Sequence, residues 1–247
     1  MMDTLISHMS PKSPISEAYR TLKTNVQFSD LDREIQTIVF TSALPGEGKT
    51  TTTSNYGVVS AKSGKRVLII DADMRKPSIH KVFRQPNVRG LSDALLSEKS
   101  PLTFVLPTDE PRLDVMTSGP IPPNPAEILG SKKMRALIDQ FKEHYDLILV
   151  DAPPVGVVTD AQILASFLDG TIVVLRVGKG DRKQSQYAVE LLNNVKAKVL
   201  GVVLNRLPIH EGGYYKYKYY HYYGNVYGDQ PETPKKGLFG RKKTKSR

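Results

Sequence analysis

The chain has 247 residues and a mass of 27.5 kDa, enough for one sizeable domain and short for two. It contains no cysteine, which excludes disulfides and thiolate metal sites and fits a reducing compartment. The net charge of +10 lies mostly at the end: without the last fourteen residues, "PKKGLFGRKKTKSR", 28 basic and 25 acidic residues remain. The folded part is therefore not expected to bind nucleic acid.

The apolar runs, such as "VLII" and "LILV", are far shorter than the roughly 18 residues of a membrane span. The polar N-terminus also lacks the pattern of a signal peptide. We therefore expect a cytoplasmic protein whose membrane contacts are peripheral. The basic end is interpreted as a solvated extension, with contact to anionic lipid as the alternative.

In chain order, "SPISEAYRTLKTNVQF" comes first and predicts an amphipathic helix with a Ser/Pro cap. Short β-branched runs then alternate with helix-length segments, and most of these runs are continuously apolar, as in strands covered on both faces. This alternation predicts an α/β fold with a doubly wound, mostly parallel sheet. The predicted strands are 37–42, 66–71, 113–118, 147–152, 170–177 and 198–205, and the predicted helices are 48–63, 124–143, 160–167 and 182–195.

The composition divides the chain into four predicted segments. An N-terminal extension with the first helix (1–33) precedes the α/β domain (34–207), which is followed by a tyrosine cluster (208–229) and a basic tail (230–247).

The loop "ALPGEGKT" (43–50) follows a predicted strand and precedes a predicted helix. It matches the phosphate-loop pattern GxxxxGK[ST] except that Ala43 replaces the first glycine. Glycines let backbone N–H groups turn toward an anion, and the following helix adds the positive end of its dipole. The ATP-binding residues predicted here are Pro45, Gly46, Glu47, Gly48, Lys49, Thr50 and Thr51.

Carboxylates end two other predicted strands. "VLIIDADMRKP" supplies Asp71, Asp73 and Arg75, and "ILVDAPP" supplies Asp151. Because open α/β sheets bind ligands at the carboxyl edge, these groups are expected to join the phosphate loop. We expect Thr50, Asp151 and Asp73 to bind Mg²⁺.

"SALPGEGKTT", "VLIIDADMRKP", "ILVDAPP" and "TSGPIPPNPAEIL" resemble, in order and spacing, motifs of the bacterial protein-tyrosine kinases. The resemblance covers nearly the whole chain and is to the stand-alone cytoplasmic form that serves capsule and exopolysaccharide export. It implies a P-loop kinase domain, transfer of the ATP γ-phosphate to tyrosine, and the cofactors ATP and Mg²⁺. It also implies four kinds of partner: a transmembrane activator of the polysaccharide co-polymerase type, a cognate tyrosine phosphatase, protein substrates, and further copies of the chain. The activator would hold the kinase at the inner face of the membrane.

Two other classes of protein fit part of the pattern. Partition and division-site ATPases share the sheet, but they carry a signature lysine five residues before the loop lysine, where this chain has Leu44. A non-catalytic nucleotide-binding scaffold would leave the strand-end carboxylates without a role.

In a kinase mechanism, Lys49 holds the phosphates and Asp71 is the candidate base for the phenol, with Asp73 as the alternative. Arg75 stabilises the developing phosphate charge or forms a structural salt bridge. Asn205 and Arg206, after the last predicted strand, stand where related P-loop proteins contact adenine.

Eight of the chain's twelve tyrosines lie between 214 and 227, beyond the predicted domain. Next to a kinase site, such a tail is a substrate at high effective concentration. Glu17, Arg20 and Lys23 share one face of the first helix and resemble the family's ExxRxxR self-association motif, with Lys23 in place of the last arginine; an ordinary solvated helix face is the alternative. The resemblance implies a ring in which each tail reaches a neighbour. The predicted autophosphorylation sites are Tyr214, Tyr215, Tyr217, Tyr219, Tyr220, Tyr222, Tyr223 and Tyr227.

Overall fold

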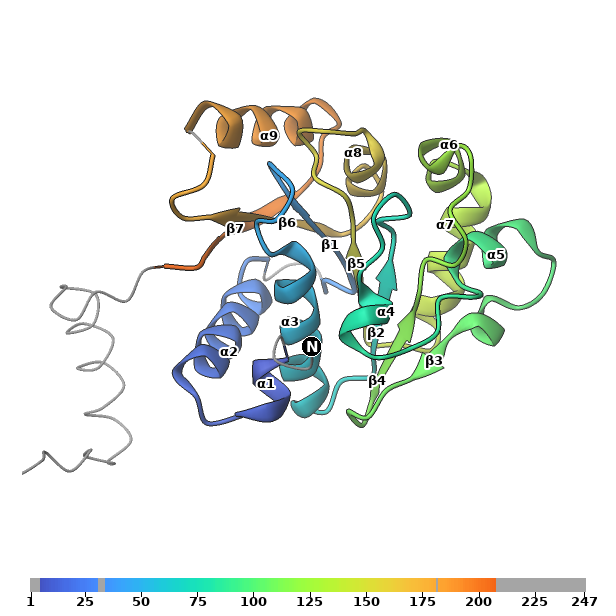
Figure 1. Cartoon of the computed structure of the whole chain (residues 1–247), viewed down its shortest axis with the longest axis horizontal. Helices are drawn as coiled ribbons and strands as arrows, with labels where there is room; N and C mark the ends of the chain where they lie inside the picture. Colours follow the sequence, from blue (N-terminus) through green and yellow to red (C-terminus); the bar gives the residue numbers. More distant parts are fainter. Residues whose placement is uncertain (1–4, 31–33, 181, 208–247) are drawn as a thin grey trace, which may run out of the picture. The chain divides into compact units, whose positions relative to one another are not determined.

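The computed structural model describes residues 5–30, 34–180 and 182–207, which belong to one compact unit that ends at Leu207. A seven-stranded sheet with the order β3-β4-β2-β5-β1-β6-β7 forms its centre (Figure 1). β3 pairs antiparallel with β4, and the other pairings are parallel. The strands are β1 (Thr37–Ser42), β2 (Val67–Asp71), β3 (Leu106–Pro107), β4 (Leu113–Met116), β5 (Leu147–Asp151), β6 (Gly170–Arg176) and β7 (Val199–Asn205).

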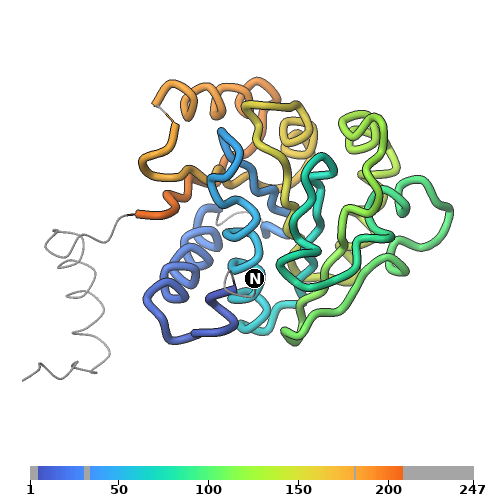
Figure 2. The backbone as a smooth tube through the Cα atoms, in the orientation of Figure 1, coloured from blue at the N-terminus to red at the C-terminus, as the bar shows by residue number. Residues whose placement is uncertain are grey.

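Helices cover both faces of this sheet, so the predicted doubly wound α/β fold is confirmed. The backbone returns through a helix between successive parallel strands such as β1 and β2 (Figure 2). On one face, α3 (Lys49–Lys62) and α4 (Ile79–Val82) pack against the sheet, and α1 (Ile6–Met9) and α2 (Pro14–Gln27) pack against α3. The other face packs against α5 (Leu91–Leu96), the 3₁₀ helix η2 (Pro101–Phe104), α6 (Pro125–Leu129), α7 (Lys132–Lys142), α8 (Asp160–Ala165) and α9 (Arg182–Asn194).

Strand β1 shows why the apolar runs are continuous. Ile38 and Phe40 point into the core beneath α3, where Phe40 meets the ring of Tyr56 at 5.5 Å. Val39, between them, points into the opposite core, because successive side chains of a strand alternate between its faces. All six residues of β1 are buried, which places the end of this strand rigidly beneath the phosphate loop.

The predicted strand ends agree with the structure to within two residues, and so does the N-terminal helix. The single predicted helix over 124–143 is wrong: α6 ends at Leu129 and α7 starts at Lys132. Gly130 and Ser131 separate them, and Ser131 caps α7 by accepting the N–H of Met134. Among the residues described, no helix is long and apolar enough to cross a membrane.

Candidate active site

The phosphate loop connects β1 to α3 at the carboxyl edge of the sheet. Gly46 and Gly48 have φ angles of +76° and +99°, in the left-handed region that favours glycine. Lys49 is the first residue of α3, so the positive end of the helix dipole points at the space that the loop encloses. The geometry is that of an anion-binding loop, even though Ala43 replaces the first glycine of the pattern.

The side chains of Glu47 and Asn205 form hydrogen bonds with the backbone of the phosphate loop. Glu47 is 2% exposed, and its carboxylate accepts the N–H of Leu44 at 2.7 Å. Asn205, at the end of β7, donates its Nδ2 to the carbonyl of Glu47 at 2.9 Å. A Cβ atom at position 48 would lie only 2.0 Å from that Nδ2, so a larger residue there would displace the Asn205 side chain. Asn205 therefore contacts the loop itself, whereas the predicted contact of Asn205 and Arg206 with adenine stays a prediction.

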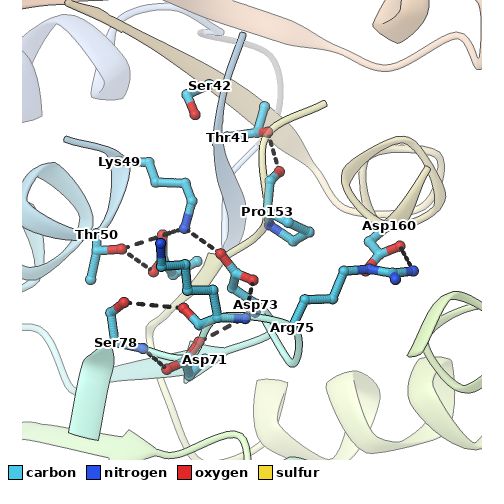
Figure 3. Close-up of polar contacts among 12 residues, drawn as sticks. Thr41, Ser42, Lys49, Thr50, Asp71, Asp73, Arg75, Ser78, Pro153 and Asp160 are labelled. Carbon is cyan, nitrogen blue, oxygen red and sulfur yellow. Dashed lines mark hydrogen bonds and ion pairs between the residues drawn. The ribbon is translucent and has the colours of Figure 1, made fainter. Parts of the chain in front are cut away.

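The predicted acidic residues meet beside the loop. Strands β2 and β5 are neighbours, and their register places Asp71 opposite Asp151. The Nζ atom of Lys49 lies 2.9 Å from Asp73 Oδ2 (Figure 3). The same atom lies 3.5 Å from Asp151 Oδ1. Thr50 donates its hydroxyl to Asp151 Oδ2 at 2.6 Å. One lysine and one threonine thus join the phosphate loop to the ends of two other strands.

Burial and the charges of neighbouring groups shift the pKa values of this cluster. Burial opposes the positive charge of Lys49, but Asp151 and Asp73 outweigh it and raise the pKa of the lysine. Burial also raises the pKa of Asp151, although Lys49 and Thr50 oppose that rise. Asp71 is fully buried, and burial together with the charge of Asp151 raises its pKa to about 7. The site therefore holds a carboxyl group that changes charge near neutral pH.

The hydrogen bonds of Asp71 are unequally divided between its two oxygens. Oδ2 accepts the N–H groups of Ser78 and Ile79, both at 2.9 Å, and so fixes the start of α4. Oδ1 accepts one longer bond of 3.2 Å, from the N–H of Asp73. Oδ1 is consequently the oxygen with room to accept another proton donor.

The oxygens at this edge suit Mg²⁺. Asp151 Oδ1 is buried without a hydrogen-bond partner among the described residues, and the Thr50 hydroxyl lies on the other oxygen of the same carboxylate. No group of three or more His, Cys, Asp or Glu side chains positioned for a metal occurs in the described part of the chain. Mg²⁺ needs no such cage, because it is commonly held by one or two protein oxygens together with phosphates and water.

Arg75 points away from this cluster. Its guanidinium forms two bonds to Asp160, Nε to Oδ2 at 3.0 Å and Nη2 to Oδ1 at 3.2 Å (Figure 3). Asp160 is the first residue of α8 and is fully buried, whereas the Arg75 side chain is 43% exposed. Of the two roles considered for Arg75, these contacts favour the structural salt bridge. Nothing local to Arg75 in the sequence indicates this partner, which lies 85 residues away.

We expect Arg75→Ala to lower the free energy of unfolding by about 1–3 kcal/mol, because it leaves the buried Asp160 carboxylate without its charged partner. Arg66→Ala is the matched control. Its two-pronged pair with Asp146 has side chains 53% and 38% exposed, so solvent screens the pair and its loss should cost less. Urea unfolding of both variants measures the difference, and an equal loss in the two would contradict a special role for the Arg75–Asp160 pair.

The other predicted site residues lie elsewhere. Glu17 and Arg20 form an ion pair along α2, and Arg20 also donates to the carbonyl of Pro11. Lys23 on α2 lines a cavity of about 360 Å³ together with Phe28 and with Tyr56 of α3. The predicted autophosphorylation tyrosines lie outside the described residues.

Comparisons with known proteins agree with this geometry. The family ParA, described as NUBPL iron-transfer P-loop NTPase, matches residues 34–215. The tyrosine-protein kinase YwqD of Bacillus subtilis is 46% identical over 218 residues, which cover 87% of this chain and 92% of that protein. The tyrosine-protein kinase wzc of Salmonella typhimurium is 34% identical over 88% of this chain, which spans only 30% of that longer protein. The crystal structure of the chimerical protein CapA2B2 superposes with a TM-score of 0.81 and 42% identity, covering 83% of this chain and 91% of that one.

Proposed function

The chain belongs to the bacterial protein-tyrosine kinases, and from this premise we propose that its Lys49 cluster transfers the γ-phosphoryl group of ATP to tyrosines of its own tail. The observation that carries the proposal is the joint contact of Lys49 and Thr50 with carboxylates from two other strands. The activity serves the synthesis and export of capsular polysaccharide or exopolysaccharide, the role that the resemblance of the motifs implies.

The phosphates of ATP would lie against the N–H groups of residues 45–51, with Lys49 as their cation. In the structure Lys49 is bonded to Asp73, so the incoming phosphates compete with that carboxylate for the lysine. Thr50, Asp151 and Asp73 would hold Mg²⁺, which would neutralise phosphate charge as transfer proceeds. Because no covalent intermediate on the protein is needed, the chain contributes alignment and electrostatic stabilisation.

Asp71 takes the proton of the attacking phenol. A free tyrosine titrates near 10, whereas a base works best with a pKa near the operating pH. The pKa of about 7 for Asp71 meets that requirement, and Oδ1 is the oxygen with room for the phenol. Asp71 is fully buried, so access of the phenol requires a local rearrangement around it.

The ATPase switch of the partition and division-site type is the alternative. Leu44 stands where those proteins carry their signature lysine. The iron transfer in the family description is not proposed for this chain, which has no cysteine to hold an iron–sulfur cluster. The match to this family supports the P-loop fold. The kinase assignment rests on relatives such as the tyrosine-protein kinase YwqD.

The tail and the self-association helix complete the proposal. Each chain phosphorylates the tail of a neighbour in a ring held by Glu17, Arg20 and Lys23. Lysine lacks the two-pronged geometry of arginine, so a contact through Lys23 is weaker than one through arginine. Because each phosphate adds about −1.5 to −2 charge, accumulating phosphate near the acidic cluster favours release of the tail and loosens the ring.

Replacing the eight tail tyrosines by Phe should remove most autophosphorylation and leave phosphorylation of an added tyrosine peptide nearly unchanged. Mixing this variant with a Lys49→Met chain that keeps its tyrosines should label the Lys49→Met chain, since transfer occurs between chains. A sample that contains only Lys49→Met chains provides the blank, because it holds no active kinase. If the Lys49→Met tail stays unlabelled in a mixture with active wild-type chains, transfer between chains is ruled out.

The remaining partners follow from the family. A transmembrane protein of the polysaccharide system acts as activator and holds the kinase at the inner face of the cell membrane. The region of wzc that matches this chain is only 30% of that protein, so the kinase region there is part of a longer polypeptide, which supports this proposal. A tyrosine phosphatase resets the tail, and other proteins carry further target tyrosines. Co-purification of the chain with membranes, with and without the activator, tests the membrane association.

A further inference from the structure

Three carbonyls of the phosphate loop, those of Leu44, Pro45 and Glu47, each accept a hydrogen bond from a side chain. Amide N–H groups that turn toward a phosphate leave carbonyl oxygens on the opposite side of the loop. Ser42 donates its hydroxyl to the carbonyl of Leu44 at 2.9 Å, and Asn205 donates to that of Glu47 at 2.9 Å. The carbonyl of Pro45 accepts a bond from the Nζ atom of Lys179. Two of these donors are neutral, whereas Lys179 brings a full positive charge to the loop.

The segment that carries Lys179 is shaped to lie against the loop. Lys179 follows β6 and stands between two glycines, Gly178 and Gly180, with φ angles of +74° and +75°. A Cβ atom on Gly46 would lie 2.9 Å from Lys179 Nζ, and one on Gly180 would lie 3.2 Å from Leu44 Cδ1. The absence of a side chain at Gly46 and at Gly180 therefore lets the two segments lie close against each other.

A third contact joins the same two segments. The N–H of Arg176, the last residue of β6, approaches Glu47 Oε1 at 3.4 Å, and Glu47 Oε2 accepts the N–H of Leu44. The end of β6 and the connection after it therefore meet the phosphate loop at Leu44, Pro45 and Glu47. Within the loop itself, "ALPGEG" has no cation before Lys49.

We infer that Lys179 is a positioning residue of the nucleotide site, supplied by the same chain. It acts through the carbonyl of Pro45, holding the loop in the conformation that presents its N–H groups to the phosphates. A loop ordered in advance binds with a smaller loss of conformational entropy. This inference rests on the nucleotide site proposed above. Because the action is on the loop, it strengthens the binding of ATP and ADP alike and leaves the transfer step unchanged.

The test compares Lys179→Met and Lys179→Arg in the full chain, with Lys183→Met as the matched control, an exposed lysine on α9. Lys179→Met should weaken the binding of both MgATP and MgADP about five- to tenfold, the worth of one hydrogen bond. KM for ATP should rise to the same extent while kcat at saturating ATP changes less than about twofold. Lys179→Arg should restore most of the affinity, and Lys183→Met should match the wild type.

Isothermal titration gives both dissociation constants, and thermal unfolding without nucleotide checks that each variant is folded. Unchanged affinities in a folded Lys179→Met chain would overturn the inference. Weaker binding of ATP with unchanged binding of ADP would also overturn the inference, because it would indicate that Lys179 contacts the γ-phosphate directly. A wild-type chain that binds nucleotide but makes no phosphotyrosine would remove the proposed kinase function and leave the Lys179 test intact.

Discussion

Lys49→Met is expected to lower phosphotyrosine formation by about 10²–10³-fold. Methionine keeps much of the aliphatic stem but removes the cation that would stabilise the transferring phosphate, and a preorganised contact of this kind is worth about 10²–10³ in rate. The same change leaves Asp73 and Asp151 without the ammonium group that now lies 2.9 and 3.5 Å from them. Since Lys49 lowers the pKa values of Asp71 and Asp151, its removal should raise both and weaken Mg²⁺ binding.

The measurement is a quantitative immunoblot or mass-spectrometric count of phosphotyrosine after incubation with ATP and Mg²⁺. Lys132→Met, an exposed lysine at the start of α7, is the matched control and should retain full activity. Phosphotyrosine formed by Lys49→Met within tenfold of the wild-type rate would remove the phosphate loop from the mechanism.

Asp71→Asn should preserve nucleotide binding and reduce phosphoryl transfer by at least about 10²-fold, the usual contribution of a general base. The amide can still accept the N–H groups of Ser78 and Ile79, so the start of α4 should remain in place. Asp139→Asn, on the exposed side of α7, controls for the loss of one carboxylate. An equal loss of nucleotide affinity and of transfer would instead make Asp71 a metal ligand or a structural residue.

The pKa of about 7 gives Asp71 two pH signatures of opposite sign. The base must be ionised, so transfer by the wild type should rise with pH and reach half its maximum near pH 7. Stability should move the other way. An unfolded Asp releases its proton near 3.8 whereas folded Asp71 keeps it up to about 7, so the contribution of Asp71 to stability falls as pH rises between these values.

Asp71→Asn should remove both signatures. Its residual transfer should lack the step near pH 7, and its free energy of unfolding relative to the wild type should improve from pH 4 to pH 8. Denaturant unfolding at several pH values measures the second effect. A stability difference that does not change with pH would show that Asp71 titrates normally, and the assignment of the base would then pass to Asp73.

The sequence predicted β1, β2 and β5 because these strands are buried on both faces, as Ile38, Val39 and Phe40 show in β1. It also placed Lys49, Thr50, Asp71, Asp73 and Asp151 at one edge, since parallel strands end together. The break between α6 and α7 was missed, although Gly130 and Ser131 are a common helix stop and start. The antiparallel strand β3 has two residues and leaves no periodic pattern to read.

Other features depend on contacts across the chain. Asp160 and Arg75 are 85 positions apart, and Lys179 and Pro45 are 134 apart. Nothing local to Arg75 or Lys179 distinguishes either residue from an ordinary surface cation. The raised pKa of Asp71 likewise arises from full burial and from Asp151 on the neighbouring strand, which only the register of β2 and β5 reveals.

The most direct test of the account is to incubate the purified full chain with ATP and Mg²⁺, alone and with the cytoplasmic segment of an activator, and to map phosphate by mass spectrometry. The account predicts phosphotyrosine within residues 214–227, weakly in the chain alone and strongly with the activator. ATP hydrolysis without any phosphotyrosine, in both conditions, would contradict it and favour an ATPase switch.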